Sequence, residues 1–583
     1  MPSHESGQLT SHYPPQRAQR AGGTPGHLFV LNGRLEALGA DAVVISTDSR
    51  FSVRDHWRRA AGLGAREDWA GLRPQGWQRG SALPASRHLR ADRQVWFLDA
   101  IGATPDEVGR AAARIVEQIA RTGGERLRST AHAAGRDLPL IAIPVLGTAG
   151  GGHDLERGLV IDAVLAHLTA AAGKHGVDVA LVASSRSDYS ALQHRRRTAG
   201  HRALPTEKLD AQARDLGDRA ARGDLALFFG AGVSIAAGLP SWHALLDRLV
   251  EAMGLDITPQ DLKDLGSLEQ AELLQVILAK RSGGHDEAAR RDSQEQLGRQ
   301  VAAILAADDL RPSLAHCLLA GMRIPEAVTT NYDHLYEEAV AASSGLPADQ
   351  HDRAISTLPW DPTKASRPWV LKMHGDVARP ATIVLSRSSF VRYDTRWKPV
   401  GSLVQSLMMT KHLLVVGASM TDDNLLRFAY EVAGLREELV AAGAPAGRGS
   451  EIGTVVHLAD DAAFSRLWEG RFDVAVASPP LPDDGAPAHE TTSPDTEEAE
   501  AAMRRRAAWG LTVFLDAVAM HAERDAPHLL DDRYLPAGPD EAALVRRLRE
   551  DARAVRGLAD VGGDRGAGWR ELAEVLERFG TAT

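Results

Sequence analysis

A glycine turn near the middle of the chain is the first feature with clear chemical potential. An apolar stretch runs into Gly230-Ala231-Gly232, which is followed by Ser234 and Pro240. Glycines let a backbone approach a pyrophosphate closely, and a helix that begins there offers free N–H groups and a positive dipole end. The turn departs from the Rossmann fingerprint, because Ile235 stands three residues after the second glycine, and no Gly-Lys-Ser/Thr follows as in a P-loop.

Three further blocks of small and polar residues follow apolar runs. They are Thr329-Thr330-Asn331-Tyr332-Asp333, Lys372-Met373-His374-Gly375-Asp376-Val377 and Gly417-Ala418-Ser419-Met420-Thr421-Asp422. A neutral amide can position water or sugar hydroxyls, and a histidine titrates in the range needed to accept a proton. Simpler roles stay open: Asn331 could cap a helix, Asp422 could stabilise a first helical turn, and His374 is one of 22 histidines.

These blocks need a sheet that brings them together. Short apolar runs of β type occur at 225–229, 326–330, 369–373, 382–386, 412–417, 453–458 and 472–478. Stretches with helical spacing lie between them, such as 242–253 and 268–281. Strands that alternate with helices predict an α/β unit with a parallel sheet, and ligands bind such sheets at the carboxyl ends of the strands.

In this order and spacing, the motifs GAGVSxxxGLPxW, TTNYD, KxHGD and GxSxxD resemble those of the bacterial branch of the sirtuin-like superfamily. The resemblance implies a Rossmann-type domain over 223–478 that binds NAD as its substrate. It assigns the NAD phosphates to Gly230, Ala231, Gly232 and Ser234, with Pro240 in the same motif. It also implies that Asn331 and Asp333 line the nicotinamide-ribose pocket, that His374 is the catalytic base, and that Gly417, Ser419 and Asp422 hold the adenosine side.

Cysteine usage separates two activities of this family. Sirtuin deacetylases carry a zinc module with two cysteine pairs, whereas this chain has one cysteine, Cys317. We therefore expect water, or the substrate itself, as the acceptor, and an NAD hydrolase that releases nicotinamide and ADP-ribose without a metal, with cyclase or transferase activity as a side reaction. A deacylase or ADP-ribosyltransferase, and a non-catalytic NAD or ADP-ribose sensor, are the alternatives. The resemblance further implies a latent effector of anti-phage defence.

Residues 26–190 alternate β-type runs and helical stretches in the same way, and they resemble a macro domain with three α/β layers. The resemblance rests on LGADAVV at 38–44, on 79–102 and on IAIPVLGTAGGG at 141–152. It implies a site for an ADP-ribose-type ligand, with Asp41 recognising adenine. Gly147, Thr148, Gly150 and Gly151 would surround phosphate through backbone N–H groups. The segment 46–57 lacks the Asn- and Gly-rich loop of that family, which puts ADP-ribosyl hydrolysis in doubt. We expect this unit to regulate its neighbour in response to ADP-ribose or a cyclic derivative.

The remaining segments complete the predicted organisation of the 583 residues. We expect a disordered arm at 1–25, a connector at 191–222, an acidic and Pro-rich linker at 479–500, and a helical segment at 501–583 that packs on the second unit or mediates homo-oligomers. A net charge of −10 argues against non-specific nucleic-acid binding. No apolar run is long enough for a signal peptide or a membrane span, so we expect a cytoplasmic protein, with a phage protein as one candidate trigger.

Overall fold

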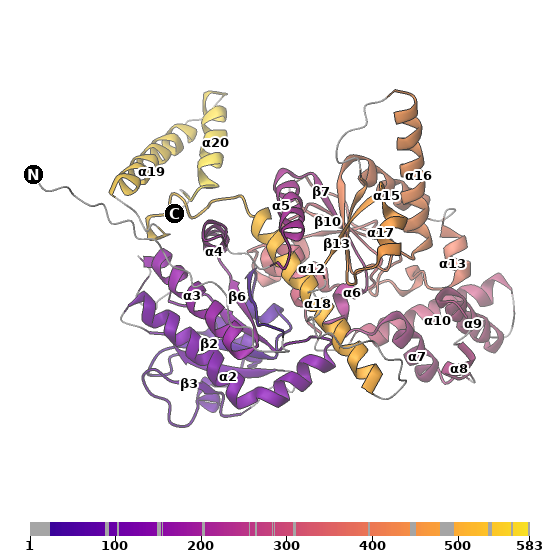
Figure 1. Ribbon diagram of the computed structural model, residues 1–583, viewed down its shortest axis with the longest axis horizontal. Coiled ribbons are helices and arrows are strands. Elements are labelled where there is room, and N and C mark those ends of the chain that lie inside the picture. Colours follow the sequence, from indigo (N-terminus) through magenta and orange to yellow (C-terminus); the bar gives the residue numbers. More distant parts are fainter. Residues whose placement is uncertain are drawn as a thin grey trace, which may run out of the picture.

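The computed structural model describes the chain except residues 1–23, 88–92, 102–103, 148–152, 154–155, 201–203, 256, 263–264, 283, 285, 307–309, 366, 394–396, 444–450, 478–494, 535–538, 561–563 and 581–583. It contains two α/β units, and a long C-terminal helix runs diagonally between them (Figure 1). The predicted arm and the glycine-rich stretch after Gly147 lie almost wholly outside the described residues. In the part of the chain that is described, no helix combines the length and the apolar character that crossing a bilayer requires.

The first unit is built on a six-stranded mixed sheet with the order β1-β6-β5-β2-β4-β3. Its strands are β1 (Leu28–Asn32), β2 (Ala42–Thr47), β3 (Ala82–Pro84), β4 (Gln94–Asp99), β5 (Leu140–Pro144) and β6 (Asp178–Ala183). β3 is antiparallel to β4, whereas the other neighbouring strands run parallel. The β-type runs that the sequence predicts in this unit, 27–31, 41–46, 94–101, 139–146 and 177–184, form strands β1, β2, β4, β5 and β6, and β3 is an addition.

The two faces of this sheet bury different partners, because successive side chains of a strand point to opposite sides. Leu28 and Val30 of β1 face α2 (Pro105–Ala133) and α3 (Arg157–His175). Phe29 and Leu31 of the same strand belong to a core that continues into the second unit. The first unit is therefore joined to the second through a shared hydrophobic core.

The second unit is built on a seven-stranded sheet with the order β13-β12-β11-β7-β8-β10-β9, and every pairing in it is parallel. Its strands are β7 (Leu225–Phe229), β8 (Glu326–Thr329), β9 (Ser356–Leu358), β10 (Trp369–Lys372), β11 (His412–Val416), β12 (Gly453–His457) and β13 (Phe472–Val476). The helices that cover it include α11 (Leu314–Gly321), α12 (Leu335–Ser343), α15 (Lys398–Thr410), α16 (Asp423–Ala441) and α17 (Ala462–Trp468). This arrangement confirms the predicted parallel α/β class.

A helical layer is inserted between β7 and β8 and has a core of its own. It comprises α7 (Trp242–Ala252), α8 (Pro259–Leu262), α9 (Ser267–Arg281) and α10 (Glu287–Leu305). The prediction of a strand at 382–386 is wrong, because this segment follows a 3-10 turn and is not paired in the sheet. Val384 instead donates its amide to the His374 carbonyl and accepts the Tyr332 hydroxyl, both at 2.8 Å. The segment therefore crosses the strand ends instead of extending the sheet.

The stretch expected as a connector, 191–222, consists of packed helices. It contains most of α4 (Arg186–Thr198) and all of α5 (Glu207–Arg222), and α5 buries Leu209, Ala213 and Leu216. The last residues of the predicted linker are also helical, since α18 (Asp495–Ala522) begins at Asp495.

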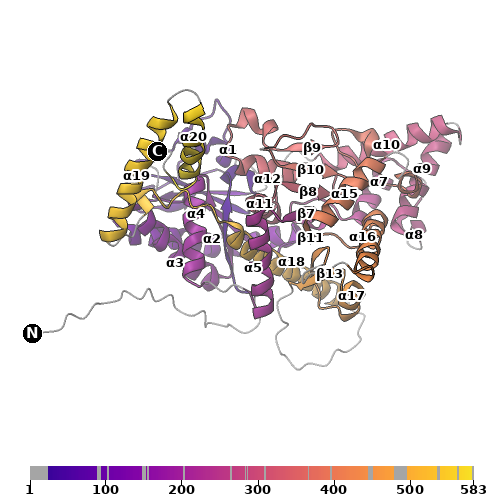
Figure 2. The same ribbon diagram turned by 90° about the horizontal axis from the view of Figure 1, so that it is seen from above.

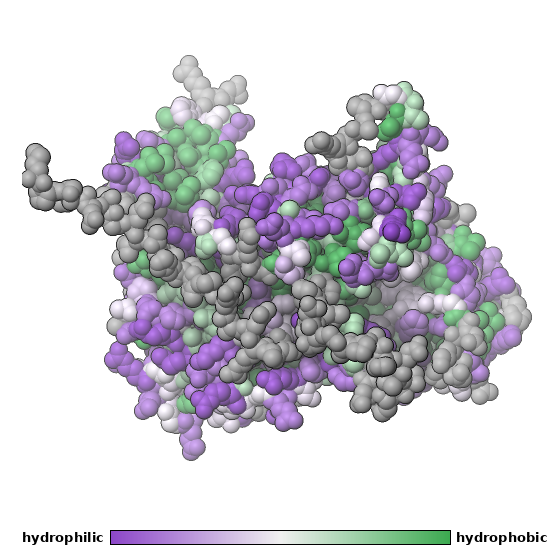
Figure 3. Space-filling view, viewed as in Figure 1, coloured by the Kyte–Doolittle hydropathy of each residue, from purple (hydrophilic) through white to green (hydrophobic). Residues whose placement is uncertain are grey.

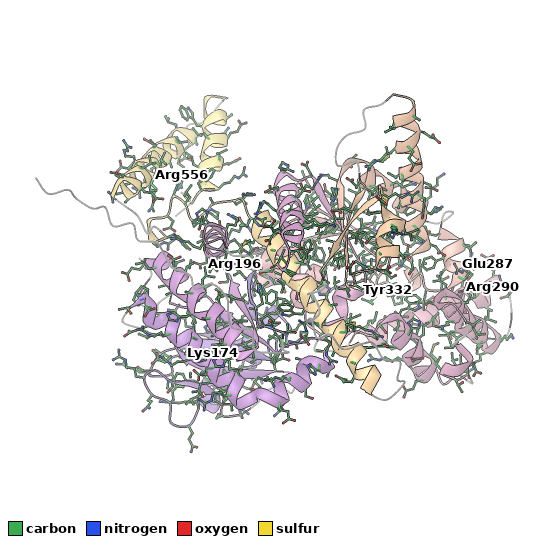
Figure 4. The ribbon with its side chains drawn as sticks, viewed as in Figure 1. Lys174, Arg196, Glu287, Arg290, Tyr332 and Arg556 are labelled. Atoms are coloured by element: carbon green, nitrogen blue, oxygen red, sulfur yellow. The ribbon has the colours of Figure 1, made fainter. Side chains whose placement is uncertain are left out.

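The C-terminal helices divide into one buried element and one projecting pair. α18 contacts α5 and α11 of the second unit and also α4 and β1 of the first (Figure 2). Its buried Asp516 accepts hydrogen bonds from Arg196 and pairs with His27 at 2.9 Å; Figure 4 labels Arg196 beside this helix. In contrast, α19 (Pro539–Ala559) and α20 (Asp564–Glu577) pack on each other. Figure 3 shows an apolar patch over that pair, which exposes Leu544, Leu558, Trp569, Leu572 and Val575.

Candidate active site

The ends of four adjacent strands, β11, β7, β8 and β10, carry the four sequence blocks. Thr329 of β8 is paired with Lys372 of β10, so Asn331 and His374 each follow that rung by two residues. The Met373 amide donates to the Thr329 carbonyl at 2.9 Å and continues the pairing beyond the strands. Asn331 and His374 are 5% and 4% exposed, so both are buried side by side at the carboxyl edge of the sheet.

The glycines of the first and last blocks are explained by the contact between the two turns. A Cβ on Gly230 would lie 2.8 Å from the Gly417 carbonyl oxygen, and one on Gly232 would lie 2.8 Å from the Gly417 Cα. Gly417 itself has φ +64°, a conformation that favours glycine. The Gly232 amide donates to the Gly417 carbonyl at 2.9 Å. These glycines let the turns that follow β7 and β11 pack against each other at the carboxyl edge of the sheet.

The Ser234 hydroxyl is the centre of a hydrogen-bond network in α6 (Gly232–Ile235). It donates to Asp333 Oδ2 at 3.0 Å and accepts from Asn331 Nδ2 at 3.0 Å. His316 Nε2 of α11 lies 3.3 Å from the same oxygen. Ser234 is 2% exposed, so this network is shielded from water.

His374 lies against a carboxylate and two aromatic rings. Its Nε2 is 3.3 Å from Asp422 Oδ2, and its ring meets Phe390 edge-on with centroids 4.9 Å apart. Burial lowers the pKa of His374, and the charge of Asp422 opposes that shift without reversing it. The imidazole is therefore neutral near pH 7, which is the form that accepts a proton. Asp422 also caps α16, accepting from the Leu425 amide at 2.9 Å.

A fully buried ammonium group ties the Asn331 loop to the His374 loop. Lys372 Nζ donates to the Tyr332 carbonyl at 3.1 Å and also to the Asp333 carbonyl. It lies 3.1 Å from Glu337 Oε1 and 3.5 Å from Asp376 Oδ2. Two long-range carbonyl bonds and two carboxylates hold this charge in place, which a surface lysine would not require.

The same carboxylates form the one group of metal-ligand type found among the described residues, His334, Glu337 and Asp376. His334 Nε2 is 2.8 Å from Asp376 Oδ1, and this bond raises the pKa of His334. Burial alone would raise the pKa of Asp376, but His334 and Lys372 together lower it to about 2. Because the Lys372 ammonium lies among these groups, it supplies the positive charge that they need.

Two buried polar atoms of this site lack hydrogen-bond partners within the described part of the chain. They are Asn331 Oδ1 and His374 Nε2, of which the second makes an ion-pair contact with Asp422 Oδ2 at 3.3 Å but no hydrogen bond. Buried polar groups are almost always paired, and an unpaired one commonly marks a place for water or a ligand. The pair therefore fits a polar ligand bound over the ends of β8 and β10.

Comparison with known proteins agrees with this geometry. Residues 325–446 match the family model of the SIR2-like domain. The chain contains a SIR2-like domain. The NAD(+) hydrolase ThsA of Bacillus cereus strain MSX-D12 is 30% identical over 214 residues, 35% of this chain and 40% of that protein. ThsA of Enterococcus faecium is 28% identical over 214 residues, 36% of this chain and 40% of that protein.

A more distant relative has a related name. Defense-associated sirtuin 2 of Bacillus subtilis is 22% identical over 224 residues, 36% of this chain and 19% of that protein. The chain thus spans at most two fifths of the length of these relatives. The predicted sirtuin-like resemblance is confirmed for the domain.

Most of the predicted residues of the SIR2-like domain come together. Asn331, Asp333 and Ser234 share one network, and the Gly417 turn borders it. Asp422, assigned by resemblance to the adenosine side, contacts His374. The Ser419 hydroxyl is taken up locally by Thr421 Oγ1 at 2.6 Å. Pro240 stands before the cap of α7, apart from this network.

Two residues of the second unit were missed by sequence reasoning. Lys372 was quoted only as part of a motif, and an alternating strand pattern does not distinguish an inward-facing lysine from a solvated one. His316 lies in an apolar run, where a histidine is easily taken for a packing residue. Its neighbour Cys317 is buried, and burial raises the pKa of the thiol to about 12.

The predicted adenine site of the first unit needs a correction at Asp41. This residue precedes β2 and so lies at the amino end of the sheet, whereas Gly147 follows β5 at the carboxyl end. The Asp41 carboxylate accepts two bonds from Arg136, at 2.6 and 2.7 Å, and one from the Leu140 amide at 2.7 Å. It is 2% exposed and has a structural role. Thr148, Gly150 and Gly151 lie outside the described residues, so the phosphate loop stays a prediction.

Proposed function

We propose that this protein hydrolyses NAD at the nicotinamide–ribose bond and releases nicotinamide and ADP-ribose. The observation that carries the proposal is the pair of buried side chains at adjacent strand ends, Asn331 with its Oδ1 unpaired and His374 with its Nε2 beside the Asp422 carboxylate. The names of the ThsA relatives, NAD(+) hydrolases, support it.

The residues divide the reaction between them. Cleavage of an N-glycosidic bond sends the bonding electrons to nicotinamide and leaves an oxocarbenium-like ribose. The Asn331 amide would then position water or the ribose hydroxyls, and neutral His374 would take the proton released when water adds to the sugar carbon. Asp422, beside His374, would stabilise the imidazolium that forms.

The direct test is NAD turnover by the purified full chain. We expect Asn331→Ala and His374→Ala each to reduce NAD cleavage by roughly 10²–10⁴-fold. His243→Ala is a matched control, because His243 is an exposed histidine of α7 in the same domain. A wild-type chain that binds NAD but never cleaves it, under any activating condition, would support a sensor.

Product analysis separates the related activities. Free ADP-ribose supports hydrolysis, whereas a cyclic product would identify a cyclase. Transfer of labelled ADP-ribose to protein would identify a transferase, and NAD consumption that requires an acyl-lysine peptide would identify a deacylase.

We further propose that the enzyme is a latent effector of anti-phage defence, controlled by its first unit. The two units share a hydrophobic core, and the Gly39 amide donates to the Pro312 carbonyl at 2.9 Å. Pro312 directly precedes Ser313, the N-cap of α11, and His316 of this helix contacts Ser234. A shift of the first unit would therefore change the position of His316 relative to Ser234.

This control is tested by adding ADP-ribose, cyclic ADP-ribose or candidate phage proteins and following NAD turnover. A macro-like ligand site, a homo-oligomer and a phage trigger remain predictions that the same assay, with light scattering, addresses. No binding and no rate change with either nucleotide would contradict a nucleotide signal.

A further inference from the structure

We propose that His316 is a positioning residue of this site: through Ser234 it sets the orientation of the Asn331 amide. The inference rests on the proposed function, because it assigns a role within that reaction. His316 lies on α11, away from the four strand-end blocks, and is fully buried at 0% exposure.

The tautomer of His316 follows from its neighbours. Its Nδ1 faces the Ser313 backbone amide at 3.1 Å and the Ser313 hydroxyl at 2.9 Å, and of these the backbone N–H can only donate. Nδ1 is therefore the acceptor, and in the neutral ring the proton lies on Nε2. Burial lowers the pKa of His316 to about 4, so the ring is neutral near pH 7. Nε2–H consequently points at Ser234 Oγ, 3.3 Å away, as a donor.

This donor restricts the Ser234 hydroxyl, which has one proton and two lone pairs. The proton goes to Asp333 Oδ2 at 3.0 Å, and one lone pair receives His316 Nε2–H. The other lone pair can accept only from an N–H group, so Asn331 must present Nδ2, at 3.0 Å. Its Oδ1 is thereby turned away from the network and left unpaired. The atom offered to NAD is thus set by two groups on Ser234: Asp333 takes its proton, and His316, as a donor, cannot take that proton and occupies one lone pair.

Helix capping alone does not account for this histidine. His316 completes a capping box with Ser313 through Nδ1, a task that Glu or Gln performs in other helices. The Nε2 contact with Ser234 adds nothing to the cap. A residue that served only the cap would not need a donor on its far side.

Three variants of the full chain test the proposal through kcat and KM for NAD. His316→Leu removes both ring nitrogens, and we expect kcat to fall about tenfold to a hundredfold, with a smaller change in KM. His316→Gln places an amide donor near the Nε2 position and should recover most of the loss. His316→Asn reaches only the Nδ1 position and should not.

A matched control keeps folding separate from positioning. His412 of β11 is also buried, has a pKa that burial lowers to about 4, and bonds to Thr454 Oγ1 at 2.9 Å, but it lies at the amino end of its strand. His412→Leu should lower Tm as His316→Leu does and leave kcat within twofold. A folded His316→Leu protein with wild-type kcat overturns the proposal, as does a Gln variant no better than Asn.

A crystal structure of His316→Leu separates this inference from the proposed function. We expect the Asn331 amide to rotate or to be disordered, whatever the activity. An unchanged Asn331 and Ser234 would overturn the positioning role even in an active enzyme. If the wild-type protein is inactive but Asn331 is displaced in the variant, only the proposed hydrolase activity is contradicted, and the positioning role stands.

Discussion

Two buried polar residues that the sequence singled out, one beside each sheet, differ in how their hydrogen bonds are satisfied. In the first unit, the carboxylate of Asp41 is fully satisfied by Arg136 and the Leu140 amide. In the second, Asn331 Oδ1 is buried without a hydrogen-bond partner within the described residues, and His374 Nε2 makes no hydrogen bond but lies 3.3 Å from the Asp422 carboxylate. Both units are α/β and both carry suggestive motifs, but of these two predicted site residues only Asn331 keeps a buried carboxamide oxygen with no hydrogen-bond partner in the described part of the chain. Unmet hydrogen-bonding capacity distinguishes a site from a structural ion pair better than residue type does.

The largest effect should come from His374→Phe. The variant keeps a ring against Phe390 and removes Nε2, which makes no hydrogen bond and lies 3.3 Å from Asp422 Oδ2. We expect NAD cleavage to fall by roughly 10²–10⁴-fold while Tm changes little, because no hydrogen bond is lost. NAD turnover assays measure the loss of cleavage, and thermal melts measure Tm. A large drop in Tm would mean that His374 stabilises the fold and would weaken the contrast.

Lys372→Met should affect both properties. The substitution leaves Glu337 and Asp376 without the buried cation and frees the carbonyls of the Asn331 loop. We expect a loss of about 3–5 kcal/mol in the free energy of unfolding, together with a lower kcat. Denaturant titration followed by NAD assays on the folded fraction would detect both. Wild-type kcat in that fraction would show that the position of the Asn331 loop does not depend on its hydrogen bonds to Lys372.

Asp41→Ala should affect stability alone. Arg136 and the Leu140 amide would lose their partner, for a cost of about 2–3 kcal/mol. NAD cleavage per folded molecule should stay unchanged, and so should any binding of ADP-ribose by the first unit. Calorimetric titration with ADP-ribose checks the second point, and a selective loss of nucleotide affinity would restore Asp41 to a ligand site.

The smallest effect concerns acid stability. The folded-state pKa of His316, about 4, lies below the ordinary value of about 6.5, so the unfolded chain binds more protons between these values. The free energy of unfolding should therefore fall as the pH drops below 6.5. At pH 5.5 this residue should account for a loss of about 1 kcal/mol relative to neutral pH. We would compare the Tm values of wild-type and His316→Gln proteins from pH 7.5 to 5. The two values should become more similar as the pH falls. Parallel pH curves would contradict the neutral buried state.

The pH dependence of catalysis should have the same direction as that of stability: kcat/KM should fall toward acid pH. Burial lowers the pKa of His374, and only the neutral ring can accept a proton. The acid limb of kcat/KM for NAD should therefore lie below pH 6.5, at the pKa of the free enzyme. A midpoint above that value would mean that Asp422 outweighs burial.

Several elements were predictable from the sequence because their signals are local. Apolar runs such as 225–229 and 412–417 became β7 and β11, and the blocks after them stand at the carboxyl ends. The segment 382–386 misled the same reasoning, since its apolar residues are buried against the helical layer while its backbone bonds to His374 and Tyr332. Burial produces the same apolar pattern whether or not a neighbouring strand is present.

What the amino-acid order determined by itself is the parallel sheet and the set of residues at its edge, because hydrophobic periodicity and turn chemistry act over a few residues. Only the tertiary structure decided which of those residues are satisfied and which are left open. Lys372, His316 and Asp41 have partners 39, 82 and 95 residues away along the chain. Such pairings depend on strand order and helix docking, which no local pattern encodes.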